Sequence, residues 1–104
     1  MTTPIRIRAR AAQGHIDVTL LMPHPMETGM RKDDSGAFVP AHYITDVQVT
    51  AAGRVVLQAR LSQAVSQDPL LSFRYRGGQI GDPLQVHWTD SRGEQRSDAV
   101  LVTA

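Results

Sequence analysis

The sequence predicts an all-β protein, an immunoglobulin-like antiparallel β-sandwich of about seven strands. Apolar and polar residues alternate with a period of two through most of the chain, which is typical of strands with one buried face. Short segments rich in Gly, Pro, Asp and Ser separate the alternating stretches, as turns between strands do. Because the Cys, Trp and Cys pattern of antibody domains is absent, a small β-barrel is the alternative architecture.

The first two strands are expected over residues 5–10 and 15–22. In the first, Ile5, Ile7 and Ala9 share one face and three arginines share the other. In the second, Leu21 interrupts the polar face, so we expect this strand to be covered on both sides. The run Pro23-His24-Pro25 ends it, because proline donates no hydrogen bond to a strand ladder.

Residues 26–40 are polar and rich in turn-forming residues, so they are expected to form a long loop or a hairpin with ragged arms. Residues 44–50 and 54–61 then form the clearest hairpin, joined by a tight turn at Ala52-Gly53. Alternation predicts that Val47 and Val49 face the core from the first strand. On the second strand it predicts one shared face made of Val55, Leu57, Ala59 and Leu61.

The last three strands follow a polar connection over residues 62–69. Their expected inward residues alternate with polar ones along each strand: Leu71, Phe73 and Tyr75, then Leu84, Val86 and Trp88, then Val100 and Val102. Residues 90–93 are expected to form the hairpin turn between the final two strands.

Length and composition bound the possible functions. The 104 residues are enough for one domain spanning 1–104, and a net charge of +1 argues against a nucleic-acid binder that relies on bulk positive charge. Cysteine is absent, so there is no disulfide, thiol nucleophile or thiolate metal site. No stretch approaches a membrane span, and residues 1–10 lack the apolar core of a secretory signal, which by itself predicts a cytoplasmic protein.

The residues offer little for catalysis or cofactor binding. The four histidines, His15, His24, His42 and His87, lie in different segments without metal-ligand spacing. No nucleophile motif is present, and Gly77-Gly78 lacks the rest of a phosphate-binding pattern. We therefore expect no enzyme activity, no bound cofactor and no metal site.

The least ordinary stretch is residues 24–31, with two prolines, two methionines and Arg31, which suits a recognition loop on a rigid scaffold. The simpler interpretation, weighed equally, is that Met26 or Met30 caps the end of the sandwich. The strand around residues 72–76 interleaves aromatic and basic residues, but alternation favours core rings backed by a solvated row of arginines.

These runs resemble the SoxZ family, the Z subunit of the carrier complex for sulfur (thiosulfate) oxidation. The resemblance rests on MPHPMETGMRKD at 22–33, Gly36, and VPAHYI at 39–44. Two later runs agree with it: VSQDPLLSFRY at 65–75, and Gly81-Asp82 followed by VHWTDSRG at 86–93. Order and spacing match from about Ile5 to Val102.

The resemblance implies an immunoglobulin-like sandwich that pairs with SoxY, whose cysteine on a glycine-flanked C-terminal arm carries sulfur intermediates to other pathway enzymes. It also implies a periplasmic location, reached by export in complex with SoxY through the twin-arginine route, in place of the cytoplasmic prediction. A partner without cysteine makes chemical sense, because a second thiol nearby could capture the cargo by exchange.

The function expected from the resemblance is passive: one sheet, or a sheet edge, packs on SoxY and stabilises it. The candidate partner-binding residues are distinctive without forming a catalytic set: His24, Met26, Met30, Arg31, Pro40 and His42. The simpler interpretation is that these residues brace a long loop within the monomer. Self-association of the isolated subunit would also be compatible with this function.

Two alternatives stay open at this point. One is a metal- or ligand-binding β-sandwich that uses His24 and His42. The other is a free-standing adhesion or carbohydrate-binding module, which would require Phe73, Tyr75 and Trp88 to be exposed in a row.

Overall fold

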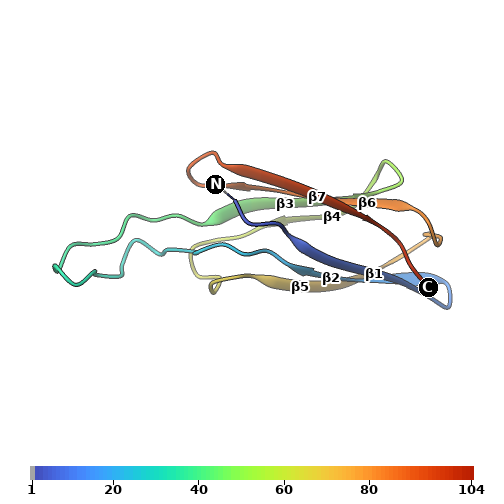
Figure 1. Ribbon diagram of the computed structural model, residues 1–104, viewed down its shortest axis with the longest axis horizontal. Coiled ribbons are helices and arrows are strands. Elements are labelled where there is room, and N and C mark those ends of the chain that lie inside the picture. Colours follow the sequence, from blue (N-terminus) through green and yellow to red (C-terminus); the bar gives the residue numbers. More distant parts are fainter. Residues whose placement is uncertain (1) are drawn as a thin grey trace.

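The computed structural model describes residues 2–104 and contains seven strands in two antiparallel sheets, with no helix in that range. The strands are β1 (Arg6–Ala12), β2 (His15–Leu21), β3 (Ile44–Ala51), β4 (Arg54–Arg60), β5 (Leu70–Arg76), β6 (Pro83–Asp90) and β7 (Gln95–Leu101). One sheet has the order β1-β2-β5 and the other the order β4-β3-β6-β7 (Figure 1). The predicted all-β sandwich is confirmed.

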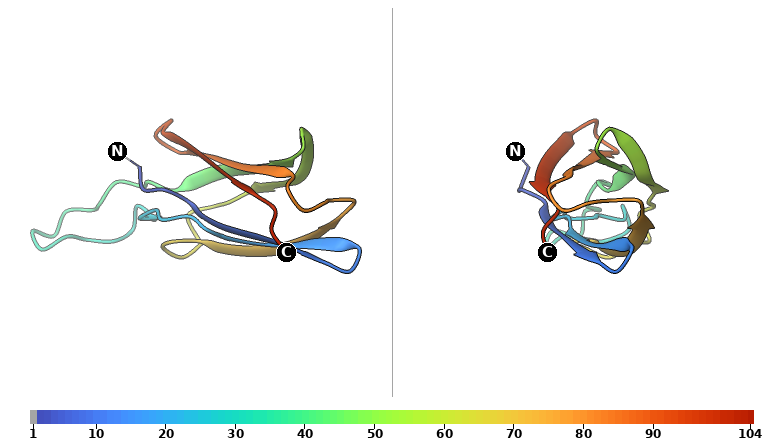
Figure 2. Two further views of the ribbon diagram at one scale, coloured as in Figure 1. Left: turned by 45° about the vertical axis from the view of Figure 1, so that its right-hand side comes forward. Right: turned by 90° about the vertical axis from the view of Figure 1, so that its right-hand side faces the viewer.

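The seven strands form two separate sheets and not one closed barrel, and short contacts join the two sheets along both sides. Along one side, a parallel bridge pairs Arg10 with Thr103, and the Ala11 N–H donates to the Thr103 carbonyl at 2.8 Å. Along the other side, Arg54 Nη2 donates to the Arg76 carbonyl at 2.9 Å. The end-on view in Figure 2 shows the two layers facing each other.

The core lies between the sheets. Side chains predicted to face inward from β3 and β6 are buried there, among them Val47, Val49, Val86 and Trp88. Tyr75 is also buried and Phe73 is half-buried against the core. Burying apolar area of this kind is the main stabilising term of the fold.

The predicted shared face of β4 is wrong at Val55, which is 50% exposed. The register shifts between Val49 and Thr50, so that Val49 pairs with Leu57 and Thr50 pairs with Val55. This β-bulge leaves Val56 as an extra residue, half-buried against the core. Val55 is therefore moved to the outer face, while Leu57 and Leu61 pack against the core as predicted.

The expectation that strand 15–22 is covered on both sides is also wrong. The outer side of β2 carries exposed Asp17 and Thr19, and Leu21 is only half-buried. Its cross-strand neighbours are Arg6 and Leu70, and Leu70 is itself 64% exposed. No further layer of the described chain lies on this side (Figure 1).

Residues 23–43 form a long projection from one end of the sandwich, here called the finger, which gives the molecule extents of 53 × 21 × 19 Å (Figures 1 and 2). It is the predicted hairpin with ragged arms. Isolated bridges join Glu27 to His42 and Lys32 to Phe38, and Asp33 organises the tip by accepting hydrogen bonds from Ser35 and Ala37. No helix long and apolar enough to cross a membrane occurs among the described residues.

Candidate functional site at the base of the finger

A buried carboxylate, Asp90, connects the base of the finger to the turn between β6 and β7. Its side chain is 0% exposed. One oxygen, Oδ1, accepts hydrogen bonds from the backbone N–H groups of Arg92 at 3.0 Å and Glu94 at 2.9 Å, which shapes the turn. The other, Oδ2, lies 3.0 Å from His24 Nε2 and 2.7 Å from His42 Nε2. One residue therefore fixes the turn and both arms of the finger.

The tautomer of His24 follows from its hydrogen bonds. The backbone N–H of Met26 donates to His24 Nδ1 at 3.1 Å, so that nitrogen acts as an acceptor and carries no proton. In the neutral ring the proton is then on Nε2, which donates to Asp90. Met26 adopts φ 48°, an unusual conformation for a bulky residue, in the turn that aims its N–H at the ring.

The backbone of His24 is fixed as firmly as its ring. Its N–H donates to Asp68 Oδ1 at 2.9 Å, and the Asp68 N–H donates back to the His24 carbonyl at 3.0 Å. The connection between β4 and β5 thus also anchors the start of the finger. Because every polar atom of His24 has a partner, the residue is held in a single orientation.

Burial and hydrogen bonding act in opposite directions on the pKa of Asp90. Burial by itself raises the pKa of a carboxyl group, and it is the largest single influence on Asp90. Hydrogen bonds from His24, His42 and the two backbone amides oppose it and together outweigh it. The pKa of Asp90 is therefore lowered, and the carboxylate is ionised at neutral pH.

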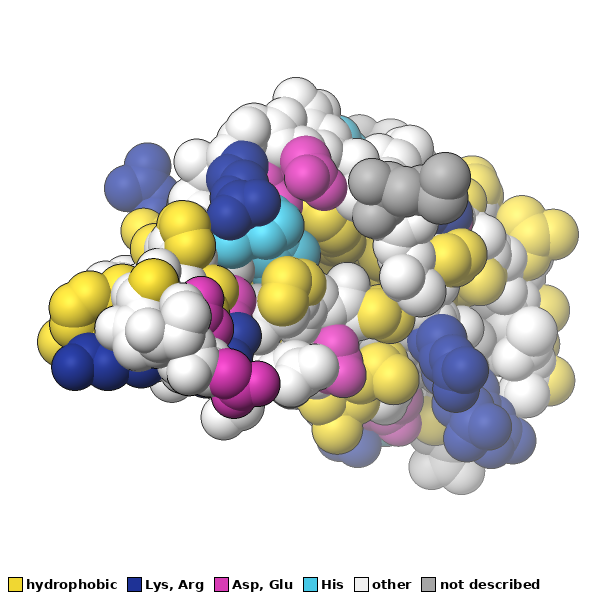
Figure 3. Space-filling view, turned by 60° about the vertical axis from the view of Figure 1, so that its left-hand side comes forward, with side chains coloured by type: hydrophobic (Ala, Val, Ile, Leu, Met, Phe, Trp, Pro, Cys, Tyr) yellow, Lys and Arg dark blue, Asp and Glu magenta, His cyan; other side chains and the backbone are white. Residues whose placement is uncertain are grey.

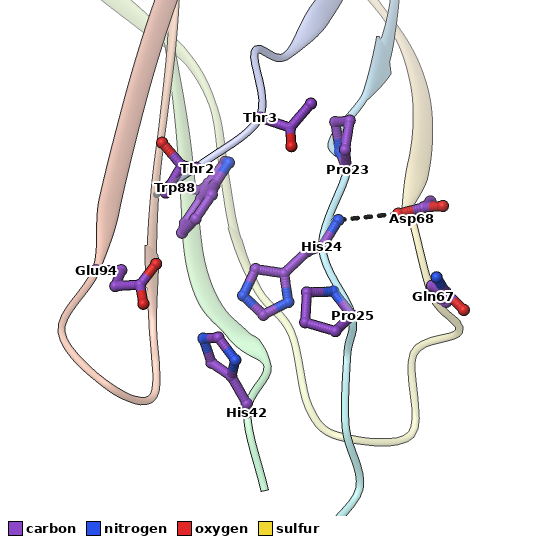
Figure 4. Close-up of a pocket in the computed structure, with 10 residues that line it drawn as sticks. All are labelled: Thr2, Thr3, Pro23, His24, Pro25, His42, Gln67, Asp68, Trp88 and Glu94. Atoms are coloured by element: carbon purple, nitrogen blue, oxygen red, sulfur yellow. Dashed lines mark hydrogen bonds between the residues drawn. The ribbon is translucent and has the colours of Figure 1, made fainter.

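A hollow of about 360 Å³ lies beside this cluster, with Trp88 on one side, Gln67 and Asp68 on the other, and His24 between them (Figure 4). The rings of His24 and Trp88 meet edge to face, with centroids 5.2 Å apart. The indole nitrogen of Trp88 is buried and has no hydrogen-bond partner among the described residues. Histidine surface is visible in this hollow behind the finger (Figure 3).

The cluster has the composition of a metal site, but its hydrogen bonds do not fit one. His24, His42 and Asp90 each offer a ligand atom, and these atoms lie within 4.8 Å of one another. A histidine ligand must give a metal the lone pair of a deprotonated nitrogen. Nε2 of His24 carries the proton. Moving this proton to Nδ1 would set the Nδ1–H of the ring against the backbone N–H of Met26, which points at the same atom. We infer a structural hydrogen-bond cluster.

The six candidate partner-binding residues separate into two groups. His24 and Met26 are buried, and His42 is only 14% exposed, so these three hold the base of the finger. Met30, Arg31 and Pro40 are exposed farther along it, and Met30 is 76% exposed. Arg31 Nε donates to the Glu27 carboxylate at 3.1 Å. Only the second group presents much surface to a partner in this structure.

The other histidines do not join the cluster. His15 lies near Asp17 at 3.4 Å, and His87 is hydrogen-bonded to Ser97 on the outer face of the four-stranded sheet. The carbohydrate-binding alternative also fails, since it needs an exposed row of rings. Trp88 and Tyr75 are buried and Phe73 is half-buried.

Sequence reasoning missed Asp90 and Phe38. Asp90 begins the turn predicted at residues 90–93, and its Oδ1 does accept the hydrogen bonds that shape this turn. Nothing in the local sequence shows that its Oδ2 also accepts hydrogen bonds from two histidines of distant segments. Phe38 lies in a polar stretch, yet it is 58% exposed on the finger, with the Lys32 ammonium 5.2 Å from its ring centroid. The signal in the sequence that could have identified Phe38 is its large apolar side chain in an otherwise polar loop.

Comparison with known proteins identifies the family. A search of curated proteins found no match. The family model described as "Sulphur oxidation protein SoxZ" matches residues 5–100 of the chain. The match covers all seven strands apart from the last residue of β7, and it includes the finger and the Asp90 cluster. The chain therefore belongs to the SoxZ family of sulfur oxidation proteins.

Proposed function

We propose that this chain is the non-catalytic subunit of a sulfur carrier, which binds and stabilises a SoxY-like subunit whose arm cysteine holds the sulfur intermediates. The observation that carries the proposal is the family match over residues 5–100. In this proposal the chain meets the other sulfur-oxidation enzymes only as part of the pair.

The geometry of the finger base supports a passive role. The main cluster of titratable side chains, around Asp90, is committed to hydrogen bonds that hold the fold. A general base needs a free lone pair within reach of a substrate proton, and Asp90 has both oxygens engaged and no exposed side-chain surface. The chain also has no cysteine to exchange with a thiol-bound cargo.

The exposed part of the finger is a candidate contact for the partner. Met30, Arg31 and Pro40 lie on it, and Phe38 adds an exposed aromatic ring beside them. Methionine, arginine and aromatic residues are enriched at protein interfaces. The hydrogen bonds of His24 and His42 tie the base of both finger arms to the sandwich.

The proposed location is the periplasm, reached by export of the folded pair on the signal of the partner. A β-sandwich that needs no disulfide is compatible with such export. Cell fractionation of strains with and without the partner gene tests this. The chain should be found in the periplasm only when the partner is present, and periplasmic chain in the strain without it would contradict the proposal.

The decisive experiment on function is a tagged pull-down from the source organism grown on thiosulfate, followed by intact-mass analysis. The expected result is a stoichiometric partner that ends in a glycine-flanked cysteine and carries additional sulfur mass. Recovery of the chain alone would contradict the proposal and would make the metal- or ligand-binding alternative the next to test.

A further inference from the structure

The outer face of the four-stranded sheet is nearly free of charge. It consists of three cross-strand rows that begin at Val55, Gln58 and Arg60 on β4 and end at Ala99, Ser97 and Gln95 on β7; we call it the neutral face. Its central row is Gln58, Gln48, His87 and Ser97. Its charged residues are Asp46 and Arg60, which lie at one corner and pair with each other at 3.7 Å.

The opposite side of the molecule is very different. The outer face of the three-stranded sheet has four rows that begin at Arg6, Arg8, Arg10 and Ala12 on β1 and end at Leu70, Ser72, Arg74 and Arg76 on β5; we call it the arginine face. Five arginines and Asp17 make six of its twelve positions charged, against two of twelve on the neutral face.

The charged arginine face is typical of a surface that stays in water, whereas the neutral face suits contact with a partner. Charged residues are depleted at the centre of protein interfaces, because burying them removes their hydration. On the neutral face, the remaining positions are Gln, Thr, Ser, His, Ala and Val. The Gln, Thr, Ser and His side chains both donate and accept hydrogen bonds, so they can pair with a polar surface that also lacks charge.

The neutral face is large enough for a stable pair. Four strands about 4.8 Å apart and seven residues long cover roughly 450 Å² in projection, and side-chain relief adds accessible area to this. A standard interface takes about 800 Å² of accessible surface from each partner. Leu101, 62% accessible, extends the surface beyond the row that begins at Val55, which is itself 50% accessible, so this end of the face carries apolar groups.

We propose that the neutral face is the main surface on which the partner subunit packs, through an uncharged sheet face of its own. This inference rests on the proposed function, which supplies the partner. The arginine face remains in solvent in the pair, because burying five arginines against one aspartate would leave several charges uncompensated. The finger then extends the contact beyond the sandwich.

The test measures the affinity between this chain and the SoxY-like subunit of the same organism, using purified full-length chains. Gln48→Glu adds a charge at the centre of the neutral face with almost no change in shape. Ser97→Glu and Ser72→Glu form a matched pair, because both serines are exposed on edge strands, one on each face. Urea midpoints and far-ultraviolet circular dichroism check that each variant is folded.

We expect Gln48→Glu to weaken pairing by about a hundredfold, Ser97→Glu to weaken it by about tenfold, and Ser72→Glu to leave it unchanged. Unchanged pairing of Gln48→Glu, or equal loss with Ser72→Glu, would overturn the neutral face as the interface and leave the proposed function standing. A stable homodimer that persists when the partner is added would assign the face to a second copy. Failure of the unmodified chain to pair would instead overturn the proposed function.

Discussion

His24 Nε2 donates to Asp90 Oδ2 at 3.0 Å across 66 residues of sequence, and both side chains are almost completely buried. The bond ties the start of the finger to the turn after β6, and His42 makes the same bond from the other arm at 2.7 Å. Asp90 accepts from four donors, so this one carboxylate links both arms of the finger to the turn after β6.

Replacing Asp90 by asparagine should destabilise the protein strongly. All four partners of the carboxylate are donors, so an amide must place its own N–H₂ group against two of them. His24 cannot change tautomer to accept, since its Nδ1 accepts from Met26. We expect a loss of about 2–3 kcal/mol in the free energy of unfolding, measured with urea.

The control for this variant is Asp46→Asn, which removes an exposed carboxylate paired with Arg60 at 3.7 Å. It should change the free energy of unfolding by less than about 0.5 kcal/mol. If Asp90→Asn were as stable as this control, the four hydrogen bonds would not hold the finger base.

Stability should fall in acid because of the same residue. The pKa of Asp90 is lowered in the folded protein, so its contribution is fully present above the usual value of 3.8 and is lost as the pH falls through the lower folded value. Urea midpoints should therefore drop as the pH falls below about 4. Asp90→Asn should show a shallower drop, and equal slopes for the two proteins would exclude Asp90 as a source of the acid sensitivity.

Zinc should not stabilise the protein, although three possible ligands converge. Two protons occupy the positions that a metal would need, one on Nε2 of His24 and one on Nε2 of His42, where each donates to Asp90. We expect no shift of the thermal midpoint with about 100 μM zinc, whereas a ligand that binds the native state would raise it. Stoichiometric zinc in the purified protein, lost in His42→Ala, would support the metal-binding alternative instead.

The sequence predicted the sandwich well because period-two alternation and turn residues are local signals. It failed at Val55, because a bulge is decided by the partner strand: the register shift opposite Val49 and Thr50 is a property of the pair. The expectation that the strand around Leu21 is covered on both sides failed because the sequence alone does not distinguish an apolar residue on an outer face from a buried one.

The candidate site was only partly predictable for a related reason. The unusual run at residues 24–31 correctly marked a distinctive loop, but the sequence could not separate residues that brace it from residues that it presents. His24 and Met26 turn inward because Asp90 and Ile44 offer them partners, and both partners lie far along the chain. Charge patterns on the two sheet faces become visible only once the strand order is known.

The turn between β3 and β4 should accept a stabilising substitution. Ala52 and Gly53 both have positive φ, 49° and 80°, which is the conformation of a type I′ hairpin turn. Asparagine tolerates this conformation better than alanine, so Ala52→Asn should raise the free energy of unfolding by about 0.5–1 kcal/mol. Ala12→Asn, at an exposed strand position, is the matched control and should not stabilise.

The finger can be tested separately from the sandwich. Met30 is 76% exposed and the Arg31 side chain 60% exposed, so the double variant Met30→Asp/Arg31→Glu should fold normally, with a urea midpoint close to that of the unmodified chain. It should weaken pairing with the SoxY-like subunit, because it adds negative charge and removes apolar surface at the same contact. Size-exclusion chromatography of mixed subunits measures this. Normal pairing by the double variant would remove the finger from the interface while leaving the neutral face to be tested by its own variants, so the two surfaces can be judged independently.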